Sequence, residues 1–142
     1  MSVPDPNWKK LGTSSNADFY RIAEDVLGIV PFADTTDDQK TARESIAFQR
    51  EHWRAVGHRG AVVVFMDTVV QQDAGARAVY VDEVQSLPST CFALVGESFY
   101  GYATSQVFTG LSKPGRPTNV FRSLDEARPW MAEMNREHGG SI

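Results

Sequence analysis

Two kinds of hydrophobic pattern alternate along the chain. Short apolar runs occupy residues 18–22, 26–32, 61–66 and 91–95, whereas apolar residues between the later runs recur every three or four positions. A continuous apolar run rich in β-branched residues is typical of a strand that is covered on both faces, and the longer spacing is typical of a helix with one buried stripe. The chain is therefore expected to alternate strands and helices.

The predicted element order is β-β-α-β-α-β-α-β-α. Five strands are expected, at residues 18–22, 26–32, 61–66, 91–95 and 118–121. Four helices are expected, at residues 35–56, 73–87, 98–111 and 124–138. Alternating strands and helices imply right-handed crossovers and an α/β fold. The sheet should be mainly parallel and five-stranded, with the first strand of the N-terminal hairpin as an antiparallel edge.

Each of the four predicted helices carries an inner stripe of mainly apolar residues. The stripe of the first helix contains Ala42, Ile46, Gln49, Trp53 and Val56. The stripe of the second contains Ala76, Tyr80, Val84 and Leu87. Residues at these spacings face the core of an amphipathic helix.

Polar segments are expected to bound one domain. Residues 1–17 contain prolines, glycine and serines and are interpreted as a flexible leader, with Trp8 able to dock onto the body. Residues 18–138 form the single domain, and residues 139–142 form a frayed tail. The length of 142 residues is enough for one core without disulfides or metals.

Composition and charge are those of an ordinary globular protein without a nucleic-acid partner. The chain is 42% hydrophobic and 23% charged, with a formal net charge of −4. A mildly acidic protein has no overall field that attracts nucleic acid, so no nucleic-acid partner is expected. The one cysteine, Cys91, lies in an apolar strand and is expected to be a buried, inert thiol. With no signal peptide and no transmembrane segment, the predicted location is the cytoplasm.

Several segments resemble the SpoIIAA-like family, the STAS/SEC14-type group of small bacterial proteins. They are residues 92–98, 111–114, 117–127 and 130–131, together with the apolar strand that ends at Asp67. The resemblance is clearest over residues 61–131. It implies a STAS-like (βα) superhelix and a relationship to anti-sigma-factor antagonists, the STAS domains of anion transporters and SEC14-like lipid carriers. Because one fold supports many activities, the resemblance does not define a function.

Ser98 is the candidate nucleophile. Gly96-Glu97-Ser98 at a strand-to-helix turn is similar to a Gly-x-Ser-x-Gly elbow, but the second glycine is displaced to Gly101. A hydrolase also needs a histidine within reach of the serine, whereas His52 and His58 lie on or just after the first predicted helix and His138 lies near the C-terminus. The favoured interpretation is that Ser98 caps the third helix.

Three carboxylates are expected near the carboxyl ends of the parallel strands, where α/β proteins usually bind ligands. They are Asp67, Asp73 and Glu97. Together they could hold a hard cation such as Mg²⁺. Helix capping by Asp73 and solvation of the other two is the favoured alternative, so no metal or cofactor is expected.

A basic loop and three aromatic residues are the candidate partner sites. Lys113 and Arg116, which cluster in sequence with Arg122 and Arg128, could recognise an anion, an acidic partner or a lipid head group. The commoner alternative is a solvated loop. Phe48, Tyr102 and Phe108 fall outside the inner stripes of their helices, and on one face they would form an apolar patch for a protein partner or a homodimer.

The sequence therefore favours a non-catalytic protein-binding or regulatory module. The alternative is a carrier or sensor of a small apolar or lipid-like ligand, held in a cavity lined by Trp53, Phe99 and Tyr100. A hydrolase that uses Ser98 is the third hypothesis.

Overall fold

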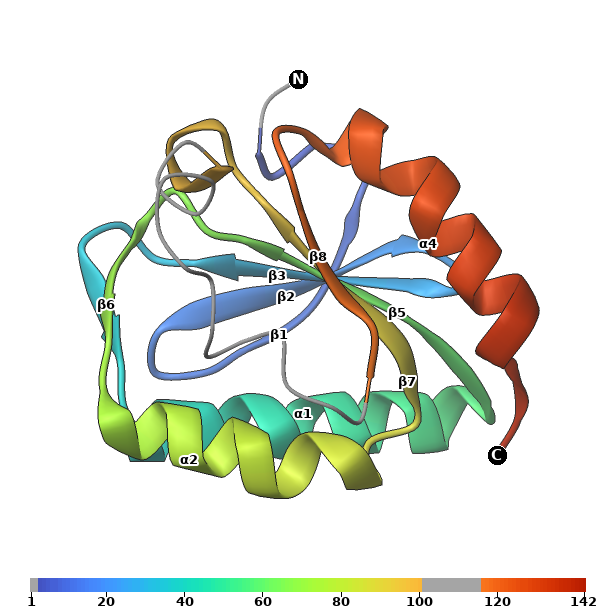
Figure 1. Cartoon of the computed structure of the whole chain (residues 1–142), viewed down its shortest axis with the longest axis horizontal. Coiled ribbons are helices and arrows are strands. Elements are labelled where there is room, and N and C mark those ends of the chain that lie inside the picture. Colours follow the sequence, from blue (N-terminus) through green and yellow to red (C-terminus); the bar gives the residue numbers. More distant parts are fainter. Residues whose placement is uncertain (1–2, 101–115) are drawn as a thin grey trace.

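Four parallel strands form the centre of the sheet in a computed structural model, which describes residues 3–100 and 116–142 (backbone only at residues 69 and 70). In order across the sheet they are β3 (Val26–Pro31), β5 (His58–Phe65), β7 (Ser89–Val95) and β8 (Thr118–Phe121). Each adjacent pair is parallel (Figure 1). The predicted α/β class and parallel centre are confirmed.

An antiparallel hairpin extends this sheet at its N-terminal edge. It consists of β1 (Lys9–Thr13) and β2 (Ala17–Ala23), and β2 pairs with β3. The edge strand is therefore β1 and not the segment at 18–22. The prediction of a flexible leader over residues 1–17 is wrong for residues 9–13. The predicted docking of Trp8 is confirmed, since its ring stacks on Phe65 at 5.4 Å.

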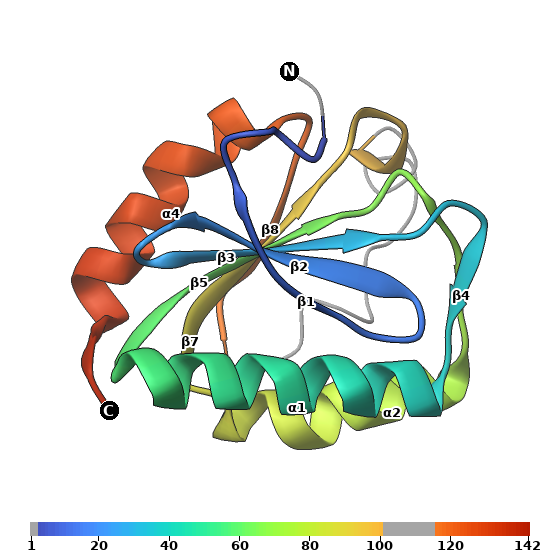
Figure 2. The ribbon, with the colours of Figure 1, turned by 180° about the vertical axis from the view of Figure 1, so that it is seen from behind.

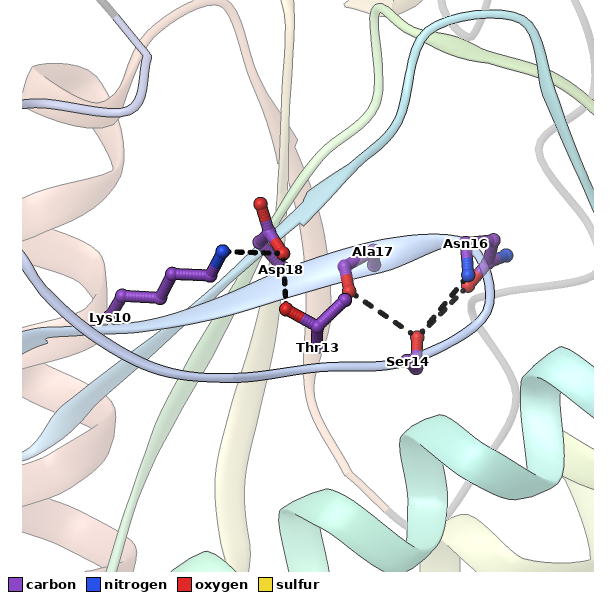
Figure 3. A network of polar contacts seen from close by, with 6 residues as sticks. All are labelled: Lys10, Thr13, Ser14, Asn16, Ala17 and Asp18. Carbon is purple, nitrogen blue, oxygen red and sulfur yellow. Dashed lines mark hydrogen bonds and ion pairs between the residues drawn. The ribbon is translucent and has the colours of Figure 1, made fainter.

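Polar contacts hold the turn between β1 and β2 (Figure 3). The Asp18 carboxylate accepts a hydrogen bond from the Thr13 hydroxyl at 2.7 Å and pairs with the Lys10 ammonium at 3.3 Å. The Ser14 backbone N–H donates to the Ala17 carbonyl at 2.8 Å. Since these contacts satisfy the polar groups of the turn, a segment with little apolar character still forms a defined hairpin.

Helices cover both faces of the sheet. The helix α1 (Gln39–Val56), the helix α2 (Ala74–Glu83) and a short 3₁₀ turn at Val84–Ser86 lie together on one face. The helix α4 (Leu124–His138) lies on the other (Figures 1 and 2). Alternate residues of β5 divide between the two faces: Val63 packs in the cluster that contains Met131 of α4, and Val62 packs in the cluster that contains Trp53 of α1.

A second, two-stranded sheet joins the main sheet to the first two helices. It pairs β4 (Thr35–Asp37) with β6 (Val69–Gln72) in parallel, and Figure 2 shows β4 running from the main sheet to the start of α1. The prediction of a helix from residue 35 is therefore wrong at its start. Asp38 is the N-cap, and its carboxylate accepts from the Thr41 N–H at 2.9 Å. The helix could not include residues 35–37 because their backbone groups pair with β6 instead.

The C-terminal segment also pairs with the sheet. Residues Gly140–Ser141 form the short strand β9, which lies antiparallel to the start of β5. The interpretation of residues 139–142 as a frayed tail is wrong for this pair. With β1 and β9, the main sheet has seven strands among the described residues rather than five.

The predicted third helix is described only at its start. Residues 97–100 are helical, and the Tyr100 N–H donates to the Gly96 carbonyl at 2.9 Å. Three candidate site residues, Tyr102, Phe108 and Lys113, lie outside the described residues. In the part of the chain that is described, no helix is long and apolar enough to cross a membrane.

The contact between the β1–β2 turn and α1 predicts a pH-dependent contribution to stability. The Glu44 carboxylate accepts from the Ser15 backbone N–H at 2.9 Å and from the Ser15 hydroxyl at 2.8 Å. These bonds hold the pKa of the Glu44 carboxyl below its ordinary value of 4.5. A folded-state pKa below the unfolded value stabilises the protein above about pH 4.5, and the contribution is lost as pH falls through the folded-state pKa.

We therefore expect Glu44→Gln to lower the free energy of unfolding at pH 7 by about 0.5 kcal/mol, a modest value because the contact is exposed to solvent. The difference should shrink as pH falls below 4.5, measured by urea denaturation of both proteins from pH 7 to pH 3. Glu51→Gln is the control, because Glu51 is exposed on the same helix and pairs only with exposed Arg54 at 3.6 Å among the described residues. A pH-independent difference for Glu44→Gln would contradict the assignment.

Candidate functional site

A cavity of about 120 Å³ lies between the sheet and the α1–α2 layer. Its walls come from β2, β3, β5, β7 and β8 on one side and from α1, α2 and the 3₁₀ turn on the other. Most of its surface is apolar, with Ile29, Val64 and Leu94 from the strands and Ile46 and Val84 from the helical layer. An apolar concave site with a few polar groups is the usual form of a small-molecule site.

The wall of the cavity at the second sheet is polar and is organised by Asp37. One carboxylate oxygen of Asp37 accepts from the Thr41 hydroxyl at 2.6 Å. The other accepts from the Tyr80 hydroxyl at 2.6 Å and from the Gln72 side-chain amide at 3.3 Å. One carboxylate thus connects β4, α1, α2 and β6, and Asp37, Gln72 and Tyr80 all line the cavity.

Tyr80 is a donor in this network. Burial, and after it the neighbouring Asp37 carboxylate, raises the pKa of the Tyr80 phenol far above its ordinary value of 10.0. The phenol therefore keeps its proton at neutral pH and donates it to the carboxylate. Its oxygen can still accept a hydrogen bond from another group.

Gln49 lines the cavity and carries a buried polar atom without a partner among the described residues. Its side-chain amide nitrogen donates to the Ser45 hydroxyl at 3.1 Å, and the residue is 3% exposed. Its Oε1 has no hydrogen-bond partner among the described residues. If the amide is turned over, the nitrogen is unpaired instead, so one polar atom lacks a partner in either orientation. Such a group costs about 1–3 kcal/mol, and native structures usually supply it with water or a ligand.

The cavity is not the one expected from the aromatic residues. Trp53 is fully buried and packs against Gly60, where an added Cβ would lie 2.2 Å from the indole ring. Neither Trp53, Phe99 nor Tyr100 is among the described lining residues. The cavity lies closer to the N-terminus of α1 than Trp53 does, at Ser45, Ile46 and Gln49.

The carboxylate of Asp67, in the turn after β5, caps the third helix. It accepts from the backbone N–H groups of Glu97 and Phe99, both at 3.0 Å. Gly96 makes this approach possible, since a Cβ at that position would lie 2.4 Å from an Asp67 carboxylate oxygen. The favoured interpretation of Ser98 as the cap is therefore corrected, because Asp67 binds the free N–H groups of the first turn.

The candidate nucleophile and the histidines lie at opposite ends of the sheet. Ser98 is exposed in the turn that follows the carboxyl end of β7. His58 begins β5, and the ring of His52 lies 4.6 Å from Trp53, whose ring is 6.0 Å from His58. His138 ends α4 beside β9, which pairs with the start of β5. The arrangement places no described histidine at the end of the sheet where Ser98 lies.

The three candidate carboxylates do not form a cation site among the described residues. Asp73 caps α2 and accepts from the Ala76 N–H at 2.9 Å, as predicted. Asp67 is engaged by two backbone N–H groups, while Glu97 is exposed. In the described ranges no three acidic, cysteine or histidine side chains group in a way that could hold a metal ion.

Arg116 and Phe48 both have structural contacts. The Arg116 guanidinium donates to the carbonyls of Gln85 at 3.1 Å and Leu87 at 2.7 Å, so it fastens its loop to the end of the α2 segment. The half-buried ring of Phe48 stacks on Phe19 at 4.0 Å and touches Gly12 of β1. The contact with β1 accounts for an aromatic side chain outside the inner stripe of α1.

A family model described as a domain of unknown function (DUF7793) matches residues 20–135, most of the chain. The chain belongs to the DUF7793 family. Comparisons with curated proteins and with solved structures gave no match. The matched region of this DUF7793 chain includes every described cavity residue except Asn16 and Ala17. The resemblance to the SpoIIAA-like family and the cytoplasmic location stay predictions.

The cysteine of this DUF7793 chain lies in the core. Cys91 is fully buried in β7, and burial raises the pKa of its thiol to about 11. A protonated, inaccessible thiol is a poor nucleophile. The expectation of a buried thiol is therefore confirmed.

The capping geometry predicts opposite results for two neighbouring sites. Asp67→Ala should lower the free energy of unfolding by about 1–2 kcal/mol, because two backbone N–H groups lose their acceptor. Ser98→Ala should change it by less than about 0.5 kcal/mol, because Ser98 is exposed. Urea denaturation of the two variants tests this, and a larger effect for Ser98→Ala would restore Ser98 as the cap.

Proposed function

We propose that this DUF7793 domain binds a small, mainly apolar molecule in the cavity between the sheet and the α1–α2 layer. The observation that carries the proposal is the cavity itself, whose mainly aliphatic walls meet one polar cluster of Asp37, Gln72 and Tyr80. A bound molecule would pack its apolar part on the aliphatic walls and form hydrogen bonds with this cluster. The proposal corresponds to a carrier or sensor and needs no catalytic group.

The chemistry of the walls supports a ligand of mixed character. Aliphatic side chains from both layers offer apolar surface, and the polar groups gather at Asp37, Tyr80 and Gln72 and at Gln49. Apolar contact supplies affinity in such sites, whereas a few fixed polar groups set the orientation of the ligand. The cavity is close in size to one of about 150 Å³ that accepts benzene in another protein, so a single ring is a suitable probe.

A protein partner or homodimer is a separate proposal. It was predicted from Phe48, Tyr102 and Phe108, and the ring of Phe48 packs under β1. The other two aromatic residues lie outside the described residues. A STAS-like relationship is likewise a proposal, supported by the alternation of parallel strands and helices beside an antiparallel edge hairpin.

Three single-ring probes of nearly equal size test the small-molecule proposal: phenethylamine, 2-phenylethanol and phenylacetate. Ligands with about nine heavy atoms bind at about millimolar Kd when they fill a site well. We expect at least one probe to bind with a Kd of about 1 mM, measured by protein-observed NMR titration. The shifted signals should come from the residues that line the cavity.

Two tryptophan substitutions on α2 provide the blocked site and its control. Val81 is 43% exposed and lines the cavity, so Val81→Trp should fill its entrance and weaken binding by about tenfold. Ala78 is exposed on the same helix and does not line the cavity, so Ala78→Trp should leave the Kd unchanged within about twofold. Failure of all three probes to bind, or equal binding by both variants, would contradict the proposal.

A further inference from the structure

We infer that the ligand of this cavity carries a protonated amine, which binds against the Asp37 carboxylate while the apolar part of the ligand occupies the aliphatic walls. The inference rests on the proposed function and adds the chemical class of the ligand. Its basis is the distribution of charge and of hydrogen-bond acceptors around the cavity.

Asp37 is the one charged residue among the described residues that line the cavity. The lining set contains neutral polar and apolar side chains besides Asp37, and no lysine, arginine or histidine. No described cation forms an ion pair with Asp37 either. A carboxylate in the cavity lining without a neighbouring cation favours a ligand of opposite charge and disfavours an anion.

The hydrogen bonds of Asp37 bring no positive charge to its carboxylate. All three donors, Thr41, Gln72 and Tyr80, are neutral groups. A carboxylate has about four acceptor sites, and three are used, one of them by the longer Gln72 contact at 3.3 Å. An ammonium group could take the remaining site, and a charge-assisted bond there would be stronger than the neutral bonds already present.

Tyr80 adds a further acceptor beside Asp37. Its oxygen can accept a hydrogen bond while its proton is given to Asp37. A primary ammonium has three N–H donors and no acceptor, which matches these two neighbouring acceptors. A carboxylate or phosphate ligand would meet the Asp37 charge with no described cation in the lining to offset it.

The same three probes separate this inference from the proposed function. At pH 7 an alkylamine is protonated, as lysine is, so phenethylamine presents a cation, 2-phenylethanol a neutral donor and phenylacetate an anion. We expect phenethylamine to bind about tenfold more tightly than 2-phenylethanol, and phenylacetate to bind most weakly. Calorimetric and NMR titrations at one fixed ionic strength measure the three Kd values.

Asp37→Asn tests the carboxylate directly. The substitution removes the charge at nearly constant volume and should bring the amine-to-alcohol affinity ratio to about one, mainly by weakening the amine. Asp38→Asn is the matched control, because it removes a charge at the next position, outside the cavity lining, and asparagine is also a good N-cap. This control should keep the ratio within about twofold of the unsubstituted protein.

Tyr80→Phe provides a second test that does not depend on the folding of Asp37→Asn. It removes the Tyr80 oxygen but keeps the carboxylate and frees one of its acceptor sites, so the amine should still bind more tightly than the alcohol because the charge remains. Equal binding of amine and alcohol, tightest binding of phenylacetate, or an unchanged ratio in Asp37→Asn would overturn the amine assignment while the small-molecule proposal stands. A ratio that falls to one in Tyr80→Phe would overturn it as well. Failure of all three probes to bind would overturn both.

Discussion

The fold depends on a central strand, β5, that is apolar on both faces from Ala61 onward. The residues from Ala61 to Met66 are all apolar, and successive side chains of a strand point to opposite faces of the sheet. Burying each valine completely is worth about 1.5–3 kcal/mol, so leaving either face in water would forfeit several such contributions. The α1–α2 layer covers the face that carries Val62, and α4 covers the face that carries Val63. The hairpin, the second sheet and the cavity are all placed relative to these two layers.

The central strands could be predicted because a continuous apolar run indicates a buried strand. The strands β1 and β4 could not, because they form only by pairing with other segments of the chain. Polar Lys9–Thr13 becomes a strand because β2 offers its edge and because Trp8 packs on Phe65. Thr35–Asp37 has the composition of a helix start, yet it pairs with β6 and helix formation begins only after Asp38. The local sequence of each segment does not show which strand it will pair with, so neither strand could be predicted from it.

The candidate site was visible in the sequence only in part. Gln49 and Tyr80 fall on the inner stripes of their helices, and a polar side chain on a buried stripe is a signal that could have been followed. Asp37 lies in a segment that looked like a helix start, and its role as a shared acceptor arises from side chains on three other elements. Conversely, Asp67 was correctly placed at the end of a strand, but its partners are backbone N–H groups rather than a ligand.

The capping contact between the turn after β5 and the first turn of the third helix couples residues 67 and 96. Any side chain larger than that of glycine at residue 96 would occupy the space of the Asp67 carboxylate. A residue at position 67 that cannot accept hydrogen bonds would leave the first turn of the following helix uncapped. The space beside residue 96 would then hold no carboxylate, so a glycine would no longer be required there. Substitution at either position should therefore be tolerated over generations mainly when the other changes with it, so aligned relatives should show positions 67 and 96 as a covarying pair.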